Sequence, residues 1–503
     1  MLRRLSLLLP VLLLLVACSG DATPTGQPSA RPTATSRPLF SLSLGNDSTP
    51  TATVEPTETS EPTPTDAPLF TEYRVRAGDT LGAISARFNL SIEELMKVND
   101  LMNPNSLQVG QVLKIPTQVA KVGPSDKLVP DSEVIYGPAY KNFEIKTIAD
   151  KYSGYLASYT ERVDGQMRTG PEILQLVAER FSVGPRVLLA LLELQGHWVT
   201  STTLSDTQVM YPMGYADGVH HDLYLQAQWA ANQLNAGYYG KISGRLGILN
   251  FTDQQRARIP GGVNPGTAAI QNVLAKTASW DDWQTLIAPS GFKAAYEKLF
   301  GDPFQYQVKP ILPADLQQPL LKLPLEEGKL WYFTGGPHAG WVDGSPWAAV
   351  DFAPADQAGS CWPSTYWVKA AAPGVITSSE YGRVVEDLDG DGFQGTGWAL
   401  LYMHMGDEGR VEVGTNIKTD DPIGHPSCQG GAAETSHVHF ARLYNGQWIP
   451  AGDAKIPMVL SGWTFSGDSQ EYDGAMTRNG ETRIAENQRV EEKNGVIPDG
   501  AEK

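Results

Sequence analysis

The sequence predicts a multidomain α+β protein with a small βααβ domain, an all-α middle domain and a C-terminal antiparallel β-sandwich or barrel-like domain. Three observations support this fold class. Residues 71–118 place two amphipathic helical stretches between two short strands, residues 131–305 carry apolar side chains at helical spacing, and residues 325–465 alternate short apolar strands with glycine turns. A chain of 503 residues has room for about three domains of ~150 residues each.

The first residues have the pattern of an export signal. Arg3 and Arg4 precede an apolar run, residues 7–16, which is too short to span a bilayer as a mature helix. The run ends in Leu15-Val16-Ala17-Cys18, which resembles the bacterial lipobox. This resemblance implies that residues 1–17 are removed as a lipoprotein signal peptide and that Cys18 carries a lipid anchor. An ordinary secretory signal with an incidental cysteine is the alternative.

Two polar segments lack the apolar side chains that a folded core needs. Residues 18–70 are dominated by Thr, Pro and Ser, so burial cannot offset the entropy of ordering them, and we expect a disordered tether. Residues 480–503 are rich in Glu, Asn and Arg, and we expect them to form a disordered tail.

The charge and the cysteine count limit the partners and the compartment. A formal net charge of −17 without a basic stripe argues against nucleic acid as a partner. Of the three cysteines, lipid takes Cys18, which leaves Cys361 and Cys428. An even pair in an oxidising, exported compartment predicts a disulfide between them, and two free buried thiols are the alternative.

The βααβ pattern carries a recognisable motif. It begins with Tyr73-x-Val75-x-x-Gly78-Asp79-Thr80-Leu81, has Asn99 in its centre and ends with Leu107-x-x-Gly110-x-x-Leu113-x-Ile115-Pro116. These residues resemble the LysM (lysin motif) domain. The resemblance implies binding of an N-acetylglucosamine-containing glycan such as peptidoglycan, near the turn formed by Gly78, Asp79, Thr80 and Leu81. The alternative is a βααβ unit that serves only as a spacer.

The middle domain contains a buried-looking segment, Val187 to Trp198, that begins after Pro185 and includes Glu193. It resembles the lysozyme-type lytic transglycosylases, which place a catalytic Glu at the end of such a helix. The residue at the matching position is Gln195, and Glu193 lies about 200° away around the helix. An amide is no general acid, so a non-catalytic lysozyme-like or spacer domain is expected here.

Near the C-terminus, His437 and His439 are two residues apart, so on a β-strand both imidazoles project from one face. They close a series of landmarks that includes Val350-Asp351-Phe352 and Tyr402-Met403-His404. This series, within residues 334–450, resembles the lysostaphin-type (LytM-like) zinc endopeptidases of peptidoglycan. The resemblance implies that Asp351 and His439 bind Zn²⁺, that His404 and His437 are catalytic, and that zinc-activated water cleaves peptide bonds.

The third zinc ligand departs from the family pattern. The position four residues before Asp351 is Trp347, which cannot bind zinc, and the nearest upstream histidine is His338, thirteen positions before Asp351. We expect His338 to be the ligand, with residues 341–346 looped out between it and the Asp351 strand, because a short insertion adds little closure entropy. His425 is the reserve candidate. If neither histidine binds, the domain is a degenerate, non-hydrolytic relative.

A second metal site is suggested by alternating carboxylates. Asp387, Asp389 and Asp391 have the spacing of a calcium loop, although the distal Glu of an EF-hand is missing. The chain therefore has a candidate Ca²⁺ site here, and a polar hairpin turn is the alternative.

These patterns together predict a lipid-anchored, exported cell-wall hydrolase. Its partners are peptidoglycan, bound through LysM and cut at peptide cross-links, and the membrane, reached through the N-terminal lipid. The main alternative is a catalytically degenerate LytM-like lipoprotein that binds peptidoglycan and regulates another wall hydrolase. A third hypothesis, hydrolysis of glycan strands by the helical domain, requires Glu193 to lie in an open cleft.

Overall fold

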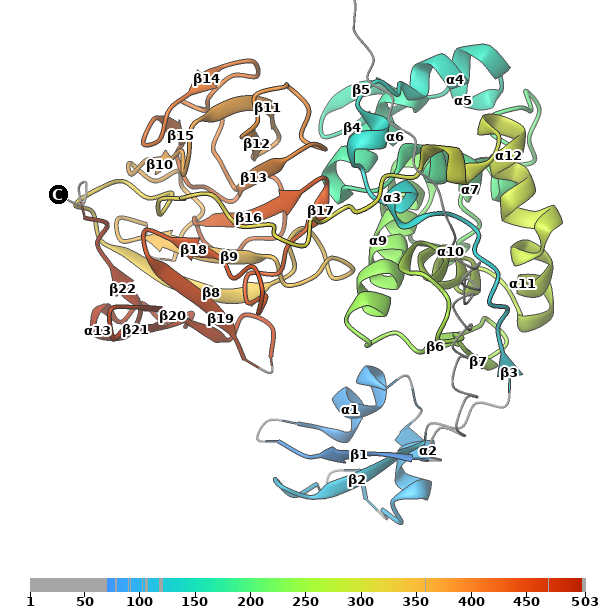
Figure 1. Ribbon diagram of the computed structural model, residues 1–503, viewed down its shortest axis with the longest axis horizontal. Helices are drawn as coiled ribbons and strands as arrows, with labels where there is room; N and C mark the ends of the chain where they lie inside the picture. Colours follow the sequence, from blue (N-terminus) through green and yellow to red (C-terminus); the bar gives the residue numbers. More distant parts are fainter. Residues whose placement is uncertain are drawn as a thin grey trace, which may run out of the picture. The chain divides into compact units, whose positions relative to one another are not determined.

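The computed structural model describes residues 70–499, except 77–78, 89, 91, 102, 105–106, 117–120, 358 and 469 (Figure 1). The predicted signal peptide, Cys18 and the predicted tether up to residue 69 lie outside the described residues. Every helix in the described ranges is too short or too polar to cross a bilayer.

The N-terminal domain has the predicted βααβ order. Its elements are β1 (Phe70–Arg74), α1 (Leu81–Arg87), α2 (Ile92–Val98) and β2 (Val112–Pro116), and the two strands pair antiparallel. Asn99 ties the end of α2 to β2, because its Nδ2 donates to the Leu95 and Lys114 carbonyls while its Oδ1 accepts from the Lys114 N–H. The buried residues form a core of their own, with Leu95 and Leu113 at its centre.

The middle domain is mainly helical. Its α-helices are α3 (Asp131–Val134), α4 (Ile145–Tyr152), α5 (Tyr155–Ser158), α6 (Gly170–Phe181), α7 (Pro185–Gly196), α8 (Asp206–Met210), α9 (Asp222–Ile242), α10 (Pro265–Ala275), α11 (Trp280–Ile287) and α12 (Ala294–Phe300). Local signals start them as expected: Pro185 opens α7, and Thr169 and Glu172 form a capping box at α6. Short helical turns η1 (Pro138–Tyr140), η2 (Pro289–Lys293) and η3 (Pro303–Tyr306) complete it.

The prediction that this domain is all-α is wrong. A hairpin joins β4 (Thr160–Val163) to β5 (Gln166–Thr169), and a three-stranded sheet has the order β3 (Lys121–Val122), β7 (Arg256–Arg258), β6 (Ile248–Asn250). These strands are short and mostly polar, so they lack the apolar alternation by which strands are recognised in a sequence. The domain also begins earlier than predicted, at β3.

The C-terminal domain is built on one large antiparallel sheet, as predicted. Its order is β14 (Asn416–Ile417), β11 (Gly374–Glu380), β12 (Arg383–Asp387), β13 (Trp398–Met403), β16 (Val438–Tyr444), β9 (Ala349–Pro354), β8 (Trp331–His338), β22 (Gly495–Val496), and β17 (Gln447–Trp448) pairs with β16. A second sheet contains β18 (Val459–Leu460), β19 (Trp463–Gly467), β20 (Gly474–Arg478) and β21 (Glu481–Ile484), and β10 (Val368–Lys369) pairs with β15 (Pro422–Gly424). The large sheet is an open path and does not close into a barrel.

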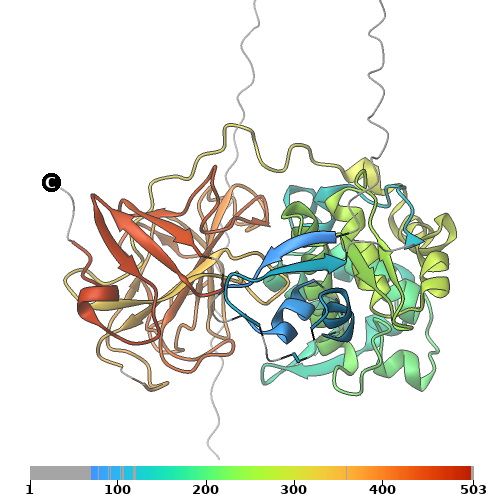
Figure 2. The same cartoon turned by 90° about the horizontal axis from the view of Figure 1, so that it is seen from below.

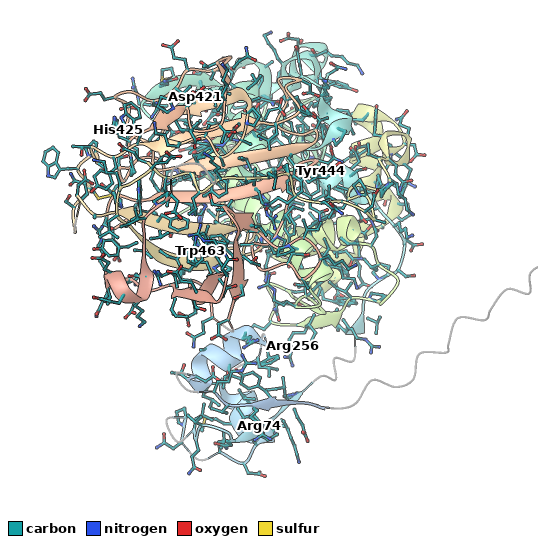
Figure 3. All side chains as sticks on the ribbon, turned by 60° about the vertical axis from the view of Figure 1, so that its left-hand side comes forward. Arg74, Arg256, Asp421, His425, Tyr444 and Trp463 are labelled. Carbon is teal, nitrogen blue, oxygen red and sulfur yellow. A yellow bond between two sulfur atoms is a disulfide. The ribbon has the colours of Figure 1, made fainter. Side chains whose placement is uncertain are left out.

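Both faces of the large sheet are covered. Side chains such as Phe352, Tyr402 and Phe440 lie in the core of the β domain. Trp463 of the small sheet, which is labelled in Figure 3, belongs to the same core. Their neighbours in the strands point to the other face and join the core of the helical domain, as Leu401 and Leu443 do. Burial on both faces explains why these strands are almost continuously apolar.

Hydrogen bonds at the second face join the sheet to the helical domain, whose ribbons lie next to the sheet (Figures 1 and 2). The Trp448 N–H donates to the Tyr239 hydroxyl at 3.0 Å, and the Trp448 indole donates to the Phe181 carbonyl at 3.3 Å. The Ser182 hydroxyl donates to the Gly446 carbonyl at 2.6 Å. The helical domain therefore shares a core with the second face of the large sheet, and the β domain keeps its own core on the first face.

The prediction of a disordered tail is wrong for its described residues, 480–499. Described residues up to 499 form β21, α13 (Glu491–Asn494) and β22, which adds to the edge of the large sheet beside β8. Asn494 is fully buried, and its Nδ2 donates to the carbonyls of Phe333, Glu486 and Gln488. The polar composition misled the prediction, because this segment is fixed by backbone and amide hydrogen bonds rather than by apolar side chains.

Candidate metal centre

Three adjacent strands bring together the residues predicted to bind zinc. His338 ends β8, Asp351 lies in β9 and His439 lies in β16 directly opposite Asp351. The Asp351 Oδ1 is 3.2 Å from His338 Nε2 and 3.3 Å from His439 Nδ1, and the two nitrogens are 2.9 Å apart. We call these three residues the His-Asp-His cluster.

The unusual spacing between His338 and Asp351 is accommodated by a loop. Residues 339–348 leave the sheet between β8 and β9, and the loop closes on itself through bonds from the Gly340 N–H to the Pro346 carbonyl and from the Ser345 N–H to the Val342 carbonyl. His338 then pairs with Ala349 in the register of the two strands. The extra residues therefore lie outside the strand pairing, as the sequence predicted.

The cluster fits a divalent cation. His338 Nδ1 faces the Gly336 carbonyl at 2.8 Å and His439 Nε2 faces the Gly340 carbonyl at 3.0 Å, so each of these nitrogens carries the proton in the neutral ring. The lone pairs of the other two nitrogens then face each other, which requires a positive charge between them. Asp351 Oδ1 is buried without a hydrogen-bond partner of good geometry in the described residues. Two imidazoles and one carboxylate are a ligand set of catalytic zinc sites.

The backbone makes room for this carboxylate. A Cβ at Gly335 would lie 2.7 Å from Asp351 Oδ2, so a larger residue at this position would displace the carboxylate. Burial alone would raise the pKa of Asp351, but His338 and His437 hold it well below its ordinary value. Asp351 is therefore an anion at neutral pH.

The two histidines predicted to be catalytic lie beside the cluster. The rings of His404 and His437 are 4.4 Å apart, and His437 Nε2 is 3.9 Å from Asp351 Oδ1. Burial, together with the neighbouring His437 and His439, lowers the pKa of His404 to about 3. His404 is therefore a neutral imidazole, and because its Nδ1 faces the Gln429 carbonyl at 2.8 Å, its Nε2 keeps a lone pair for the cleft.

His404 has an unusual backbone. It follows the last residue of β13 and has φ 69°, in the left-handed region that non-glycine residues rarely adopt. Ser427 holds this conformation, because its N–H and its hydroxyl both donate to the His404 carbonyl, at 2.6 and 2.9 Å.

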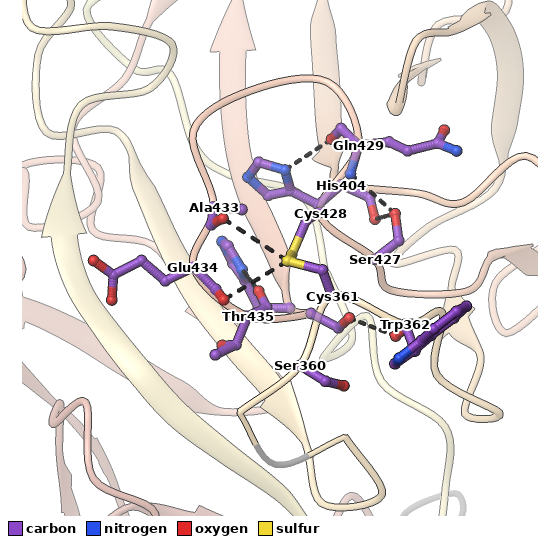
Figure 4. Close-up of a disulfide and its surroundings, with 12 residues drawn as sticks. Ser360, Cys361, Trp362, His404, Ser427, Cys428, Gln429, Ala433, Glu434 and Thr435 are labelled. Carbon is purple, nitrogen blue, oxygen red and sulfur yellow. Dashed lines mark hydrogen bonds between the residues drawn. A yellow bond between two sulfur atoms is a disulfide. The ribbon is translucent and has the colours of Figure 1, made fainter.

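Cys361 and Cys428 form the predicted disulfide next to these contacts (Figure 4). Cys428 lies between Ser427 and Gln429, the two residues that bond to His404. The Cys361 loop is also tied to the segment that contains His437, because the Ser436 N–H donates to the Ser360 carbonyl at 2.7 Å. The disulfide therefore joins the loops that lead to His404 and His437.

Sequence reasoning missed Tyr472. It lies between β19 and β20, beyond the predicted end of the domain, and its ring stacks on His338 with centroids 4.2 Å apart and an interplanar angle of 17°. Its neighbour Glu471 accepts a hydrogen bond from the Ala339 N–H at 2.8 Å, which holds this hairpin against the cluster. No metal or histidine pattern surrounds Tyr472 in the sequence, so only its aromatic character could have drawn attention to it.

The reserve ligand lies elsewhere. His425 Nδ1 faces the Tyr366 carbonyl at 2.9 Å, and its ring lies 3.8 Å from that of Trp367 (Figure 3). Glu193 is not in an open cleft either: it is 3% exposed, and its carboxylate accepts hydrogen bonds from the backbone of Val199 and Thr200 and from Lys298. Its role is structural, which removes the basis for glycan hydrolysis at Glu193.

The candidate calcium loop keeps its carboxylates together. One oxygen from each of Asp387, Asp389 and Asp391 lies within 4.8 Å of the others. The Lys141 ammonium of the helical domain lies 2.7 Å from Asp391 Oδ2 and already supplies a positive charge. Calcium binding stays a prediction.

The predicted glycan-binding turn is described only in part, because Gly78 lies outside the described residues. Asp79 Oδ2 accepts hydrogen bonds from the Tyr73 hydroxyl and the Arg76 N–H, both at 2.7 Å, and Thr80 Oγ1 caps α1. Leu81 is 1% exposed in the core, so its side chain offers no surface to a ligand. Glycan binding near this turn stays a prediction.

An antiparallel sheet that carries a His-Asp-His cluster and two further histidines is the site that the resemblance to the lysostaphin-type endopeptidases implied. The family model described as "LysM domain" matches residues 73–116, and the model described as "LasA, N-terminal domain" matches residues 127–314. The chain therefore contains a LysM domain, and its middle domain is similar to a family that the sequence analysis did not name.

Two curated relatives cover different parts of the chain. Protease LasA of Pseudomonas aeruginosa is 25% identical over 304 residues, which cover 56% of this chain and 68% of that protein. N-acetylmuramoyl-L-alanine amidase XlyB of Bacillus subtilis is 41% identical over 46 residues, which cover 9% of this chain and 14% of that protein. The similarity to LasA and the LysM match confirm the recognition of a LysM domain and of a similarity to LytM-like peptidases.

Among solved structures, the M23 metalloprotease pseudoalterin is 27% identical and has a TM-score of 0.28, with 33% of this chain and 96% of that chain covered. The catalytic domain of lysostaphin from Staphylococcus simulans is 23% identical and has a TM-score of 0.18, with 24% of this chain and 87% of that chain covered.

Proposed function

We propose that this protein is an exported, lipid-anchored cell-wall hydrolase that holds peptidoglycan through its LysM domain and cleaves peptide cross-links at a zinc centre. The observation that carries the proposal is the meeting of His338, Asp351 and His439 beside His404 and His437. Three of these histidines, His338, His404 and His439, line one cleft. The similarity to Protease LasA supports the same class of reaction. The degenerate regulator is disfavoured, because every histidine that the family pattern requires has a counterpart in the site.

Zn²⁺ held by His338, Asp351 and His439 would act as a Lewis acid on the scissile carbonyl and lower the pKa of water. The remaining chemistry belongs to the side chains of this chain. The neutral His404 accepts a hydrogen bond from the attacking water through Nε2 and orients it. The proton that this water loses on attack is passed to the departing amine as the C–N bond breaks, and His437, whose ring lies 4.4 Å from that of His404, serves this transfer. Tyr472 keeps the His338 ring in its plane by stacking.

The envelope location rests on sequence features outside the described residues. In this proposal the lipobox-like Cys18 anchors the chain, and the Thr/Pro/Ser-rich segment that follows it, which lies outside the described residues, links the anchor to the LysM domain. The Cys361–Cys428 disulfide suits an oxidising compartment. The enzyme thus acts on the wall that faces its membrane.

Metal content and digestion of peptidoglycan test the proposal. The purified full chain is expected to hold one zinc per molecule and to release cross-linked peptides from isolated cell walls, and His439→Ala is expected to lose both properties. The proposed hydrolase activity is refuted if the carefully handled wild-type protein contains no zinc, or if it contains zinc and releases no peptides. Stimulation of another wall hydrolase by the wild type and by His439→Ala alike would favour the regulator.

A further inference from the structure

The cleft at the His-Asp-His cluster has a second wall. It encloses about 650 Å³, and on one side it is lined by His338, His404 and His439 with the loops around them. The opposite side comes from the helical domain, mainly from the first half of α9 and the segment before it. The residues of this side that we call the helical wall are His220, Tyr224, Gln228, Trp229 and Asn232.

Contacts at two rims of the cleft fix the helical wall in place. At one rim, the Gly344 N–H of the inserted loop donates to Asn232 Oδ1 at 2.8 Å, and a Cβ at Gly344 would lie 2.1 Å from the Asn232 carbonyl oxygen. At the other rim, the buried Arg180 lies 2.6 Å from Asp164 and supports the Tyr381 ring at 5.6 Å. The wall is therefore a built part of the cleft and not a loosely placed neighbour.

The helical wall offers polar groups that the described residues leave unused. The half-buried Gln228 amide has no hydrogen-bond partner in the part of the chain that the structure describes. His220 is held by Asp217, whose Oδ2 is 2.6 Å from its Nδ1, so its Nε2 is left for a ligand. The half-exposed Tyr381 adds a hydroxyl and a ring face from across the rim. A cavity with a few converging polar groups is typical of a ligand site.

The same wall carries a rigid aromatic surface. Tyr215 stacks on Trp229 with centroids 4.0 Å apart and an interplanar angle of 5°, so Trp229 is supported from behind where it lines the cleft. Flat rings beside amide and imidazole groups suit a ligand that is itself a ring with apolar faces and polar edges. An N-acetylated pyranose has this chemistry, whereas an extended peptide needs mainly backbone donors and acceptors.

We propose that the helical wall binds the N-acetylated amino sugar to which the stem peptide of the substrate is attached. The inference rests on the proposed function, and it makes the wall a specificity-determining surface for the peptidase next to it. A volume of about 650 Å³ has room for a sugar as well as the peptide bond to be cut. The enzyme then reads glycan and peptide in one cleft, separately from the LysM domain.

Two soluble substrates test the inference: a cross-linked dimer of disaccharide-bearing stem peptides, and the same dimer from which an amidase has removed the sugars. With the full-length, zinc-loaded protein, we expect kcat/KM to be at least fivefold higher for the sugar-bearing dimer. The double variant His220→Ala/Gln228→Ala should reduce this ratio to below twofold, mainly through KM. Met167→Ala, an exposed side chain of β5 outside the cleft, is the matched control and should keep the ratio.

A second variant alters the aromatic part of the wall, and only variants with a cooperative melting transition like that of the wild type are compared. Trp229→Leu keeps an apolar side chain at the wall and should also reduce the ratio. All variants keep the LysM domain, so a ratio that stays high in both the double variant and Trp229→Leu assigns the preference to LysM and overturns the inference. Equal rates for the two substrates in the wild type overturn it as well.

Failure of the proposed function has a different signature. If the wild type cuts neither dimer, the hydrolase is refuted, and calorimetric binding of the two dimers then decides the inference. Tighter binding of the sugar-bearing dimer that the double variant loses supports the wall. Equal affinity for the two dimers overturns the inference and indicates that the helical wall binds the stem peptide.

Discussion

Removal of the Cys361–Cys428 disulfide should impair catalysis without emptying the metal site. Serine at both positions keeps the approximate size of the side chains and breaks only the cross-link. The cross-link is next to Ser427 and Gln429, which hold His404, whereas the His-Asp-His cluster makes no hydrogen bond to either cysteine loop among the described residues. The variant therefore distinguishes the contribution of His404 and His437 from that of the metal ligands.

Two magnitudes can be worked from the structure. The disulfide joins residues 67 positions apart, and the chain-entropy model gives a loss of about 4 kcal/mol in the free energy of unfolding for such a loop. The left-handed φ of 69° at His404 is held by bonds from residues 427–429, which lose their covalent support. Because a misplacement of ~1 Å can cost roughly 100-fold, we expect kcat to fall by about 10- to 100-fold.

The assay compares the wild type and Cys361→Ser/Cys428→Ser at a temperature where both are folded. KM should change by less than about twofold, since a catalytic group rather than the binding surface is displaced. Zinc content should stay at one per chain. A variant that is less stable but has the wild-type kcat would refute the argument that the disulfide positions His404, and a variant that loses zinc would show that the cross-link supports the whole site.

Three further predictions follow from single residues. His338→Ala should weaken zinc binding by more than the ~10- to 100-fold that is typical when a residue hydrogen-bonded to a metal ligand is removed. His425→Ala should bind zinc as the wild type does. An equal loss of zinc affinity in both variants would refute our choice of His338 as the ligand. Burial raises the pKa of Glu386 to about 7, above its unfolded value, so the folded state binds the extra proton and stability falls as pH rises from about 4.5 to 7, by about 3 kcal/mol. Glu386→Gln should keep the bond to the Tyr402 hydroxyl and flatten this decline in urea unfolding at several pH values, and an unchanged decline would contradict it. Glu193→Gln should lower the free energy of unfolding by about 1–3 kcal/mol but leave peptide cleavage intact, and loss of cleavage by folded protein would reopen a catalytic role.

Asp351 and His439 were predicted as metal ligands from the resemblance to the lysostaphin-type endopeptidases, and the period of two in a strand placed only His437 and His439 on one face. Asp351 and His439 lie in short apolar strands, and their register follows once the strands pair. His338 was harder, since a loop length does not reveal where the chain rejoins the sheet. Tyr472 was out of reach, because its contact with His338 joins positions 134 residues apart (472 − 338) through a hairpin in a second sheet.

The largest miss concerns the contact between domains. Strands such as β13, with Trp398 to Met403 all buried, are apolar at every position, which indicates burial on both faces. The sequence predicted separate helical and β domains, and no partner was assigned to a second face of these strands. Which partner covers a second face is a matter of tertiary packing, and neither periodicity nor motif spacing contains it.

The shared core has a thermodynamic consequence. One apolar cluster contains the helical domain and one face of the large sheet, the other face of that sheet packs in the core of the β domain, and the LysM domain has a separate cluster of its own. Heating should therefore melt the helical and β domains in a single cooperative transition and the LysM domain in another. A destabilising change in the helical domain would therefore lower the melting temperature of the β domain that carries the metal centre. Selection for activity then also acts on residues of the helical domain that lie far from the site.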